Sequence, residues 1–225
     1  MDSLTEIDWF PVYLSLQVAT LATLVAVSAG IPLAWFLARH QFPGKRLLEA
    51  LILLPIILPP TVLGYYLLRA IGRQSALGGF IEGTLGVEII FTWKAAVLAS
   101  TIVAIPLVMR AAQSAFETVD PTLEAAARTL GRSELSIFLT ITAPLAWRGI
   151  LAGTVLGFAR AMGEFGATLM VAGNIPGRTQ TLPIAIYDAV QAGRPDTANT
   201  LVLLLSLLAV AVLVLLGRLS WGNRW

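Results

Sequence analysis

Long apolar runs constrain this chain more than any other feature of its sequence. Five stretches of roughly twenty residues are dominated by Leu, Val, Ile and Ala, and such a length suffices for a helix to cross the hydrocarbon core of a bilayer. Charged residues make up only 12% of the chain, about half the share in a soluble domain, and the mean hydropathy is +0.81. The sequence therefore predicts an all-α integral membrane protein.

The apolar runs predict five transmembrane helices within a single domain that covers residues 1–225. The second run contains three prolines, which release backbone carbonyls that other groups must satisfy. They are compatible either with a broken helix that lines a pathway or with a packing kink. The acidic N-terminus lacks the basic residues of a signal peptide, so the first run is expected to remain as a span. The predicted spans are 12–38, 47–68, 92–109, 149–172 and 200–217.

The Lys and Arg residues are unequally divided between the two sides of the membrane. Nine lie after the first, third and fifth runs and five on the other side, with Arg160 set aside because it lies within a span. Loops rich in Lys and Arg face the cytoplasm. The N-terminus is therefore predicted to lie outside, and the C-terminus and the polar loop 120–144 in the cytoplasm.

This polar loop predicts two short helices joined at a glycine. Asp120 can cap the first helix, Pro121 fits its first position, and Gly131 suits the left-handed residue that ends it. Ser133 can cap the second helix, and Pro144 is expected to end it. Each helix would measure about 15 Å, which is too short to cross a bilayer.

Helical spacing divides the first of these helices into two faces. One face should carry Glu124 and Arg128 and be hydrated, while the apolar face packs against the protein. The apolar face comprises Leu123, Ala126, Ala127 and Leu130.

The fourth apolar run contains the charged pair Arg160 and Glu164. Arg160 lies about 16 Å along the helix from Gly149, near the membrane midplane, where a lone charge costs at least ~2.5 kcal/mol. Four residues apart, the two side chains can pair on one helix face, which also carries Gly149, Gly153 and Gly157 for close packing. Two interpretations remain open. Arg160 lines the path of an anionic substrate with Glu164 holding it, or the pair is a structural lock between helices.

Several functional classes lack the residues that they require. There is no cysteine, and the only Gly-Lys pair, Gly44-Lys45, lies outside any phosphate-binding loop pattern. His40 is the only histidine and is interpreted as a loop residue rather than a metal ligand. The net charge of +2 is too small to suggest nucleic acid as a partner. We therefore expect no catalytic residue, metal or bound cofactor here, and ATP hydrolysis would have to come from another chain.

The polar loop resembles the "EAA" loop of type I ABC importer permeases. In that family the acidic residue would fall at position 125, which is Ala here, with Glu124 one position earlier. We therefore expect shape and small-residue packing, rather than the charge of Glu124, to serve docking. The residues that match or neighbour the motif are Glu124, Ala125, Ala126, Ala127, Gly131, Ile141 and Pro144.

Further blocks extend the resemblance over most of the chain. They are similar to molybdate permeases and their sulfate relatives, and the last block is closest to the molybdate branch. The blocks are FPGK at 42–45, LPIILPPTVLGYYLL at 54–68, LEAAARTLG at 123–131, FARAMGEFGAT at 158–168 and NIPGRTQTLPIAIYDAVQAG at 174–193.

The resemblance implies a lipid-embedded homodimer with its pathway on the two-fold axis, in the cytoplasmic membrane of a bacterium or archaeon. Two cytoplasmic ATPase subunits would carry ATP and Mg²⁺, and an oxyanion-binding protein would dock outside. Arg178 and Arg194 are candidate contacts for that protein, with ordinary solvated loop charges as the alternative. Sulfate or tungstate remains an alternative substrate. An ion-gradient-driven transporter and a non-transporting scaffold are the rival classes, and the single charged pair and odd number of spans disfavour the former.

Overall fold

The computed structural model describes the backbone of residues 8–221 and, apart from residues 85 and 215–221, their side chains. Within this part all regular structure is helical. Four helical segments are long and apolar enough to cross a membrane. They are α1 (Phe10–Arg39), α5 (Trp93–Glu117), the continuous segment Glu134–Met162, and α11 (Pro195–Trp221).

The second predicted span is a sharply bent pair of helices. α2 (Lys45–Ile57) and α3 (Pro60–Ile71) meet at 112°. Leu58 is extended, as a residue before proline prefers, and Pro59 has no N–H to continue the helix. The helix is therefore broken rather than merely kinked, and the bent pair raises the number of possible spans from four to five.

The fourth predicted span differs from the observed helix at both ends. Its helical segment begins at Glu134 with α7 (Glu134–Ile137), passes through a π-helical turn, η1 (Phe138–Thr142), and continues as α8 (Ala143–Met162). The prediction that Pro144 ends a short helix was wrong. The wider π-turn directly precedes the proline and lets the chain continue past it as a helix.

At the other end of this segment the helix stops ten residues before the predicted boundary. Gly163 and Glu164 interrupt it, and the separate short helix α9 (Gly166–Ala172) follows. The predicted span over 149–172 is therefore not one continuous helix. α10 (Leu182–Gln191) then leads into α11.

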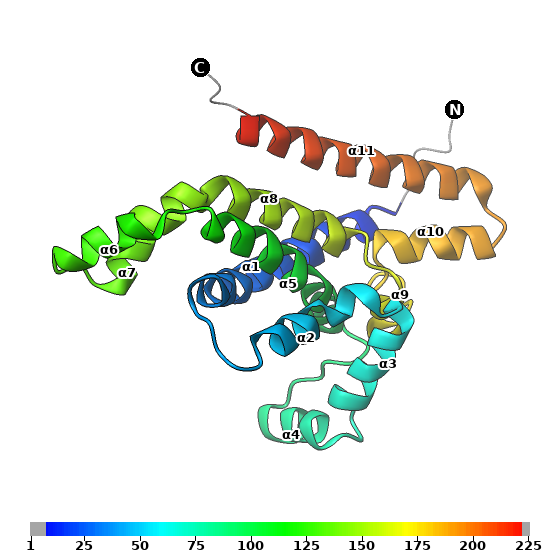
Figure 1. The fold of residues 1–225 in the computed structure, drawn as a ribbon. Helices are drawn as coiled ribbons and strands as arrows, with labels where there is room; N and C mark the ends of the chain where they lie inside the picture. Colours follow the sequence, from blue (N-terminus) through cyan, green and yellow to red (C-terminus); the bar gives the residue numbers. More distant parts are fainter. Residues whose placement is uncertain (1–7, 222–225) are drawn as a thin grey trace.

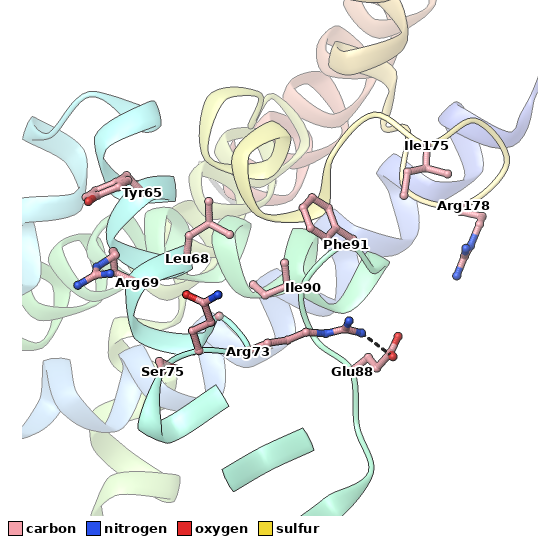
Figure 2. Close-up of a pocket in the computed structure, with 12 residues that line it drawn as sticks. Tyr65, Leu68, Arg69, Arg73, Ser75, Glu88, Ile90, Phe91, Ile175 and Arg178 are labelled. Carbon is pink, nitrogen blue, oxygen red and sulfur yellow. Dashed lines mark hydrogen bonds and ion pairs between the residues drawn. The ribbon is translucent and has the colours of Figure 1, made fainter. Parts of the chain in front are cut away.

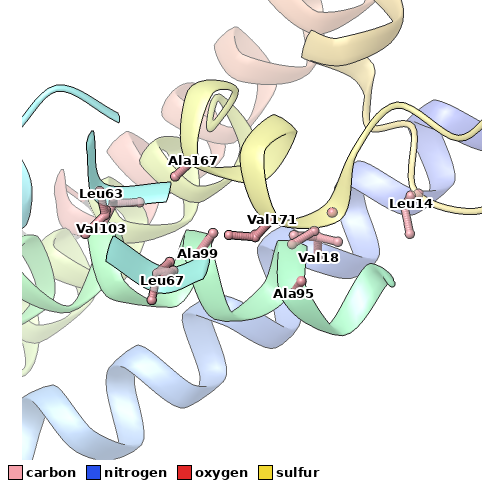
Figure 3. Packing of buried hydrophobic residues seen from close by; sticks show 11 residues of the cluster. Leu14, Val18, Leu63, Leu67, Ala95, Ala99, Val103, Ala167 and Val171 are labelled. Atoms are coloured by element: carbon pink, nitrogen blue, oxygen red, sulfur yellow. The ribbon is translucent and has the colours of Figure 1, made fainter. Parts of the chain in front are cut away.

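α1 and α5 lie side by side at the centre of the molecule, and α8 packs along α5 (Figure 1). Alanines dominate the buried contacts because small side chains allow helices to approach closely. Figure 3 shows one cluster of buried residues, whose members include Leu14 and Val18 of α1, Leu67 of α3, Ala99 of α5 and Val171 of α9. A second cluster joins the C-terminal ends of α1 and α5 and contains Leu37, Met109 and Phe116.

The two ends of this helical core carry different appendages. α6 (Pro121–Thr129) and α7 form a hairpin at the end where α1 finishes. α9 and α10 lie at the other end of the molecule, and α4 (Ala76–Leu85) follows α3 (Figure 1). The hairpin and the loop between α9 and α10 thus face opposite directions.

Candidate functional site

The hairpin between α5 and α8 has the local geometry that its sequence predicts. The Asp120 carboxylate accepts a hydrogen bond from the Thr122 N–H at 2.9 Å, which caps α6 and lowers the pKa of Asp120 below its usual value. Gly131 has φ +78°, and the Arg132 N–H closes the helix on the Ala127 carbonyl at 3.1 Å. Ser133 caps α7 through the Ser136 N–H. The predicted caps and stop are confirmed.

The predicted assignment of faces in α6 was wrong for Glu124 and most of the apolar face, although Arg128 is exposed as expected. Glu124 is 2% exposed, whereas Leu130 is 83% exposed and Leu123 is 46% exposed. Only Ala127 of the expected apolar face is buried. Leu135 of α7 is also exposed, so the outer surface of the hairpin carries three uncovered leucines, which we call the hairpin leucine surface: Leu123, Leu130 and Leu135.

A partner from a distant part of the chain explains why Glu124 lies inside. Arg39, in the last turn of α1, donates to Glu124 Oε1 from Nη2 at 2.7 Å and from Nε at 3.1 Å. The Thr142 hydroxyl of the π-turn donates to the same oxygen at 2.7 Å. These bonds compensate a carboxylate that burial would otherwise penalise. Sequence reasoning missed both Arg39 and Thr142, although an arginine at the end of the first apolar run was visible.

The predicted pair of Arg160 and Glu164 does form, with Nη1 and Oε2 2.7 Å apart. The two side chains do not, however, share the face of one helix. Arg160 is in the last turn of α8 and its side chain is 33% exposed, while Glu164 lies in the break before α9 and is fully enclosed. Glu164 Oε1 also accepts the Ala167 N–H at 2.9 Å. The pair therefore sits at a helix break, where the carboxylate holds the start of α9.

The glycine pattern of α8 serves its predicted purpose of close packing. An added Cβ on Gly153 would lie 2.9 Å from the Cβ of Ala111, and one on Gly157 would lie 2.7 Å from a methyl of Val108. Gly149 makes a still closer approach to Ala115. The backbones of α8 and α5 thus touch along this stripe.

Arginines from three segments line a cavity of about 540 Å³ (Figure 2). Its lining comes from α3, the segments on either side of α4 and the α9–α10 loop, away from the hairpin (Figure 1). Arg69 of α3 and Arg178 of the α9–α10 loop lie on opposite sides of it. Arg73 is paired with Glu88 at 2.7 Å and with Glu82 at 3.2 Å. Among the described residues, Arg178 has no ion-pair partner.

The other candidate arginine of this region lies in a different setting. Arg194 is bound to Asp188 at 3.0 Å. Within the described residues, no group of three or more His, Asp or Glu side chains is arranged to hold a metal ion.

Comparison with known proteins places this architecture in a family. The model of the family described as "Binding-protein-dependent transport system inner membrane component" matches residues 30–220. The chain is 44% identical over 213 residues to the molybdenum transport system permease protein ModB of Escherichia coli K12, covering 94% of this chain and 93% of that protein. It is 46% identical over 208 residues to the ModB of Haemophilus influenzae, covering 92% and 91% of the two chains. It is also 45% identical over 197 residues to a putative molybdenum permease of Bacillus subtilis, covering 87% of each.

Solved structures agree in fold at much lower sequence identity. An inward-facing form of the MetNI methionine ABC transporter superposes with a TM-score of 0.76 at 18% identity and covers 100% of both chains. A bacterial ABC transporter for alginate gives 0.72 at 15% identity, covering 99% of this chain and 82% of that one.

The hairpin, the helix arrangement and these matches confirm the resemblance seen in the sequence. The chain belongs to the family of binding-protein-dependent transport system inner membrane components and is a multi-pass, non-catalytic permease subunit of an ABC transporter.

Proposed function

We propose that this chain is the permease of an ATP-driven molybdate importer. The observation that carries the proposal is its 44–46% identity, over nearly the full length, to permeases named for molybdenum transport in three different bacteria. The block at 174–193, which resembles the molybdate branch, forms the α9–α10 loop and α10. Tungstate and sulfate are the alternative substrates that the test below separates from molybdate.

The hairpin supports a specific docking mode for the partner ATPase. Its exposed leucines form an apolar surface on a segment that the distribution of Lys and Arg assigns to the cytoplasm. In our proposal two copies of this chain form a lipid-embedded homodimer, and each hairpin leucine surface fits one ATPase subunit. ATP and Mg²⁺ bind to those subunits and not to the permease.

The opposite end of the molecule is then the outer face, where an oxyanion-binding protein docks. Arg178 lines the basic cavity there, and its lack of an ion pair with any described residue leaves it available for an acidic partner. Arg194 would have to exchange Asp188 for such a partner, so it is the weaker candidate. This orientation puts the N-terminus outside and the C-terminus in the cytoplasm.

Alternating access follows from this arrangement. ATP binding closes the ATPase dimer, the hairpins move with it, and the helices around the two-fold axis open outward. The binding protein releases its anion into the pathway, and hydrolysis restores the inward-open state. Arg160, partly exposed at the break between α8 and α9, is the candidate to meet the anion, with Glu164 holding its guanidinium.

The test is uptake of radiolabelled molybdate into proteoliposomes that contain the permease and its cognate ATPase, with the binding protein present. We expect uptake that requires ATP and is reduced by unlabelled molybdate more strongly than by sulfate. Stronger competition by tungstate or sulfate would reassign the substrate within the same class. Uptake that follows an imposed ion gradient without ATP would support a secondary transporter, and no uptake with intact ATPase binding would support a scaffold.

A further inference from the structure

The most enclosed charge in the hairpin does not belong to the surface that we assign to docking. Glu124 is 2% exposed and points away from the hairpin leucine surface, toward the end of α1. Its bonds to Arg39 and Thr142 connect the hairpin with two membrane helices at once. A residue that only served ATPase docking would have no need of these partners.

Four charges alternate in sign across this junction. Arg39 of α1 binds Glu124 of α6, Arg128 lies 3.7 Å from the second oxygen of Glu124, and Arg128 in turn binds Glu134 of α7. Arg39 Nη2 also donates to the Val119 carbonyl in the turn before α6, at 3.3 Å. The end of α1 is thereby fastened both to α6 and to the segment that leads into it.

α6 itself packs little against α1, although the turn before it does, since Val119 shares a buried apolar cluster with Leu37. The contacts of α6 are mainly with α7 and η1 rather than with α1. A cavity of about 480 Å³ lies between the end of α1 and α6. Trp35 and His40 line its α1 side, and Pro121 lines its α6 side. The charged link is therefore the main direct contact between α6 and α1.

A buried ion pair suits positioning better than it suits stability. Desolvation offsets most of the attraction within such a pair, so its net contribution to folding is small, while removal of one partner is costly. The π-turn that supplies Thr142 is itself an irregularity of the kind found at functional positions. Both features indicate that the Arg39–Glu124 pair serves to position α6 relative to α1 rather than to stabilise the fold.

We propose that the Arg39–Glu124 pair transmits movement of the hairpin to α1, so that ATPase closure displaces this helix. Arg39 and Glu124 are positioning residues in this scheme, and the hairpin leucine surface is the separate place where the ATPase binds. The inference rests on the proposed function, since it presumes a permease that an ATPase drives through this hairpin.

The test separates coupling from assembly. Glu124→Gln keeps the shape of the side chain but removes its charge, and the exchange Arg39→Glu with Glu124→Arg restores opposite charges in reversed positions. Arg132→Gln, which removes an exposed hairpin charge outside this network, is the matched control. For each variant, co-purification with the ATPase, ATP hydrolysis and molybdate uptake are measured in the same proteoliposomes.

We expect Glu124→Gln to lower uptake per ATP hydrolysed at least about fivefold while ATPase binding is retained. The charge exchange should recover part of that loss, and Arg132→Gln should behave as the wild type. An unchanged ratio in Glu124→Gln, or loss of the complex in both Glu124→Gln and the exchange, would overturn the inference. Molybdate uptake by the wild type is measured in parallel. Absence of wild-type uptake would contradict the proposed function, whereas normal wild-type uptake with an unchanged ratio in Glu124→Gln would contradict only the present inference.

A distance measurement tests the mechanical part directly. Because the sequence has no cysteine, spin labels can be placed at Gln41→Cys and Thr122→Cys, two exposed positions on either side of the junction. With Glu124 intact, the distance between the labels should stay constant between nucleotide-free and ATP-trapped complexes. With Glu124→Gln it should change with the nucleotide state. A distance that changes equally in both forms would show that α1 does not follow the hairpin through this pair.

Discussion

Gly153 of α8 lies so close to Ala111 of α5 that an added Cβ would be 2.9 Å from the alanine Cβ, inside ordinary contact distance. The Val108 carbonyl oxygen is also only 3.0 Å from that position. Neither neighbour is a flexible side-chain end that could turn away. The distance between the two helices is therefore set by the absence of a side chain at Gly153.

Gly153→Ala should consequently destabilise the permease, because α8 and α5 must separate to admit the methyl group. We expect a loss of about 1–3 kcal/mol, the usual cost of overpacking. The loss of stability is measured by thermal unfolding in detergent, monitored as the disappearance of the monodisperse peak in size-exclusion chromatography. Gly83→Ala in α4 is the control, since a Cβ there meets nothing within 4 Å. Equal behaviour of the two variants would contradict the close-packing argument.

Leu130→Glu should weaken binding of the ATPase subunit without unfolding the permease. Leu130 is exposed in the structure, so the charge costs little in the free chain, but it would have to be buried in the complex. Loss of one buried leucine removes about 1.5–3 kcal/mol, which corresponds to a fall of at least about tenfold in affinity. Titration of labelled ATPase against permease in nanodiscs measures the change.

Leu130→Met retains the apolar area and should bind as the wild type does. Leu130→Glu is a better probe of ATPase docking than deletion of residues 120–144. A deletion would remove the start of the Glu134–Met162 helix along with the hairpin. Undiminished binding of Leu130→Glu would place the docking surface elsewhere.

Gly131→Ala should loosen the hairpin through backbone strain alone. Gly131 has φ +78°, and nothing lies within 4 Å of an added Cβ, so no steric contact contributes. A non-glycine residue in this conformation costs roughly 1–2 kcal/mol. Hydrogen exchange of the α6 amides should become faster, and the ATPase affinity should fall with it. Gly131→Asn should have a smaller effect because asparagine tolerates the left-handed conformation.

The Arg160–Glu164 pair allows its two interpretations to be separated. Arg160→Gln alone leaves an enclosed carboxylate without its cation, so impaired assembly is expected whichever role the arginine has. Arg160→Gln combined with Glu164→Gln removes both charges and should restore assembly, as judged by size-exclusion chromatography. If Arg160 meets the anion, the double variant will assemble but lose molybdate uptake. Normal uptake by that variant would leave only the structural interpretation.

Local signals accounted for the parts of the fold that the sequence predicted well. The length of the apolar runs, the cap at Asp120, the left-handed stop at Gly131 and the glycine spacing of α8 each depend on neighbouring residues along one helix. The membrane class, the hairpin and the family resemblance followed from such patterns. The same kind of reasoning could not place the breaks at Leu58 and Gly163, because prolines and glycines within an apolar run are compatible with a kink as well as a break.

Contacts between distant segments decided the rest, and the inner face of α6 is the clearest case. Helical periodicity predicted that the leucines are buried and that Glu124 is hydrated. In the structure, Arg39, which lies 85 residues earlier, binds the Glu124 carboxylate on the inner face, and Leu130 is exposed. A buried carboxylate is stable only where hydrogen-bond donors compensate its lost hydration. The local sequence around Glu124 does not reveal which distant donors the folded chain places beside it. The sequence by itself thus determined that this is a membrane permease with a short helical hairpin between two of its spans. Only the tertiary structure decided which side of that hairpin faces outward for a partner, because that choice depends on the Arg39–Glu124 pair that folding assembles.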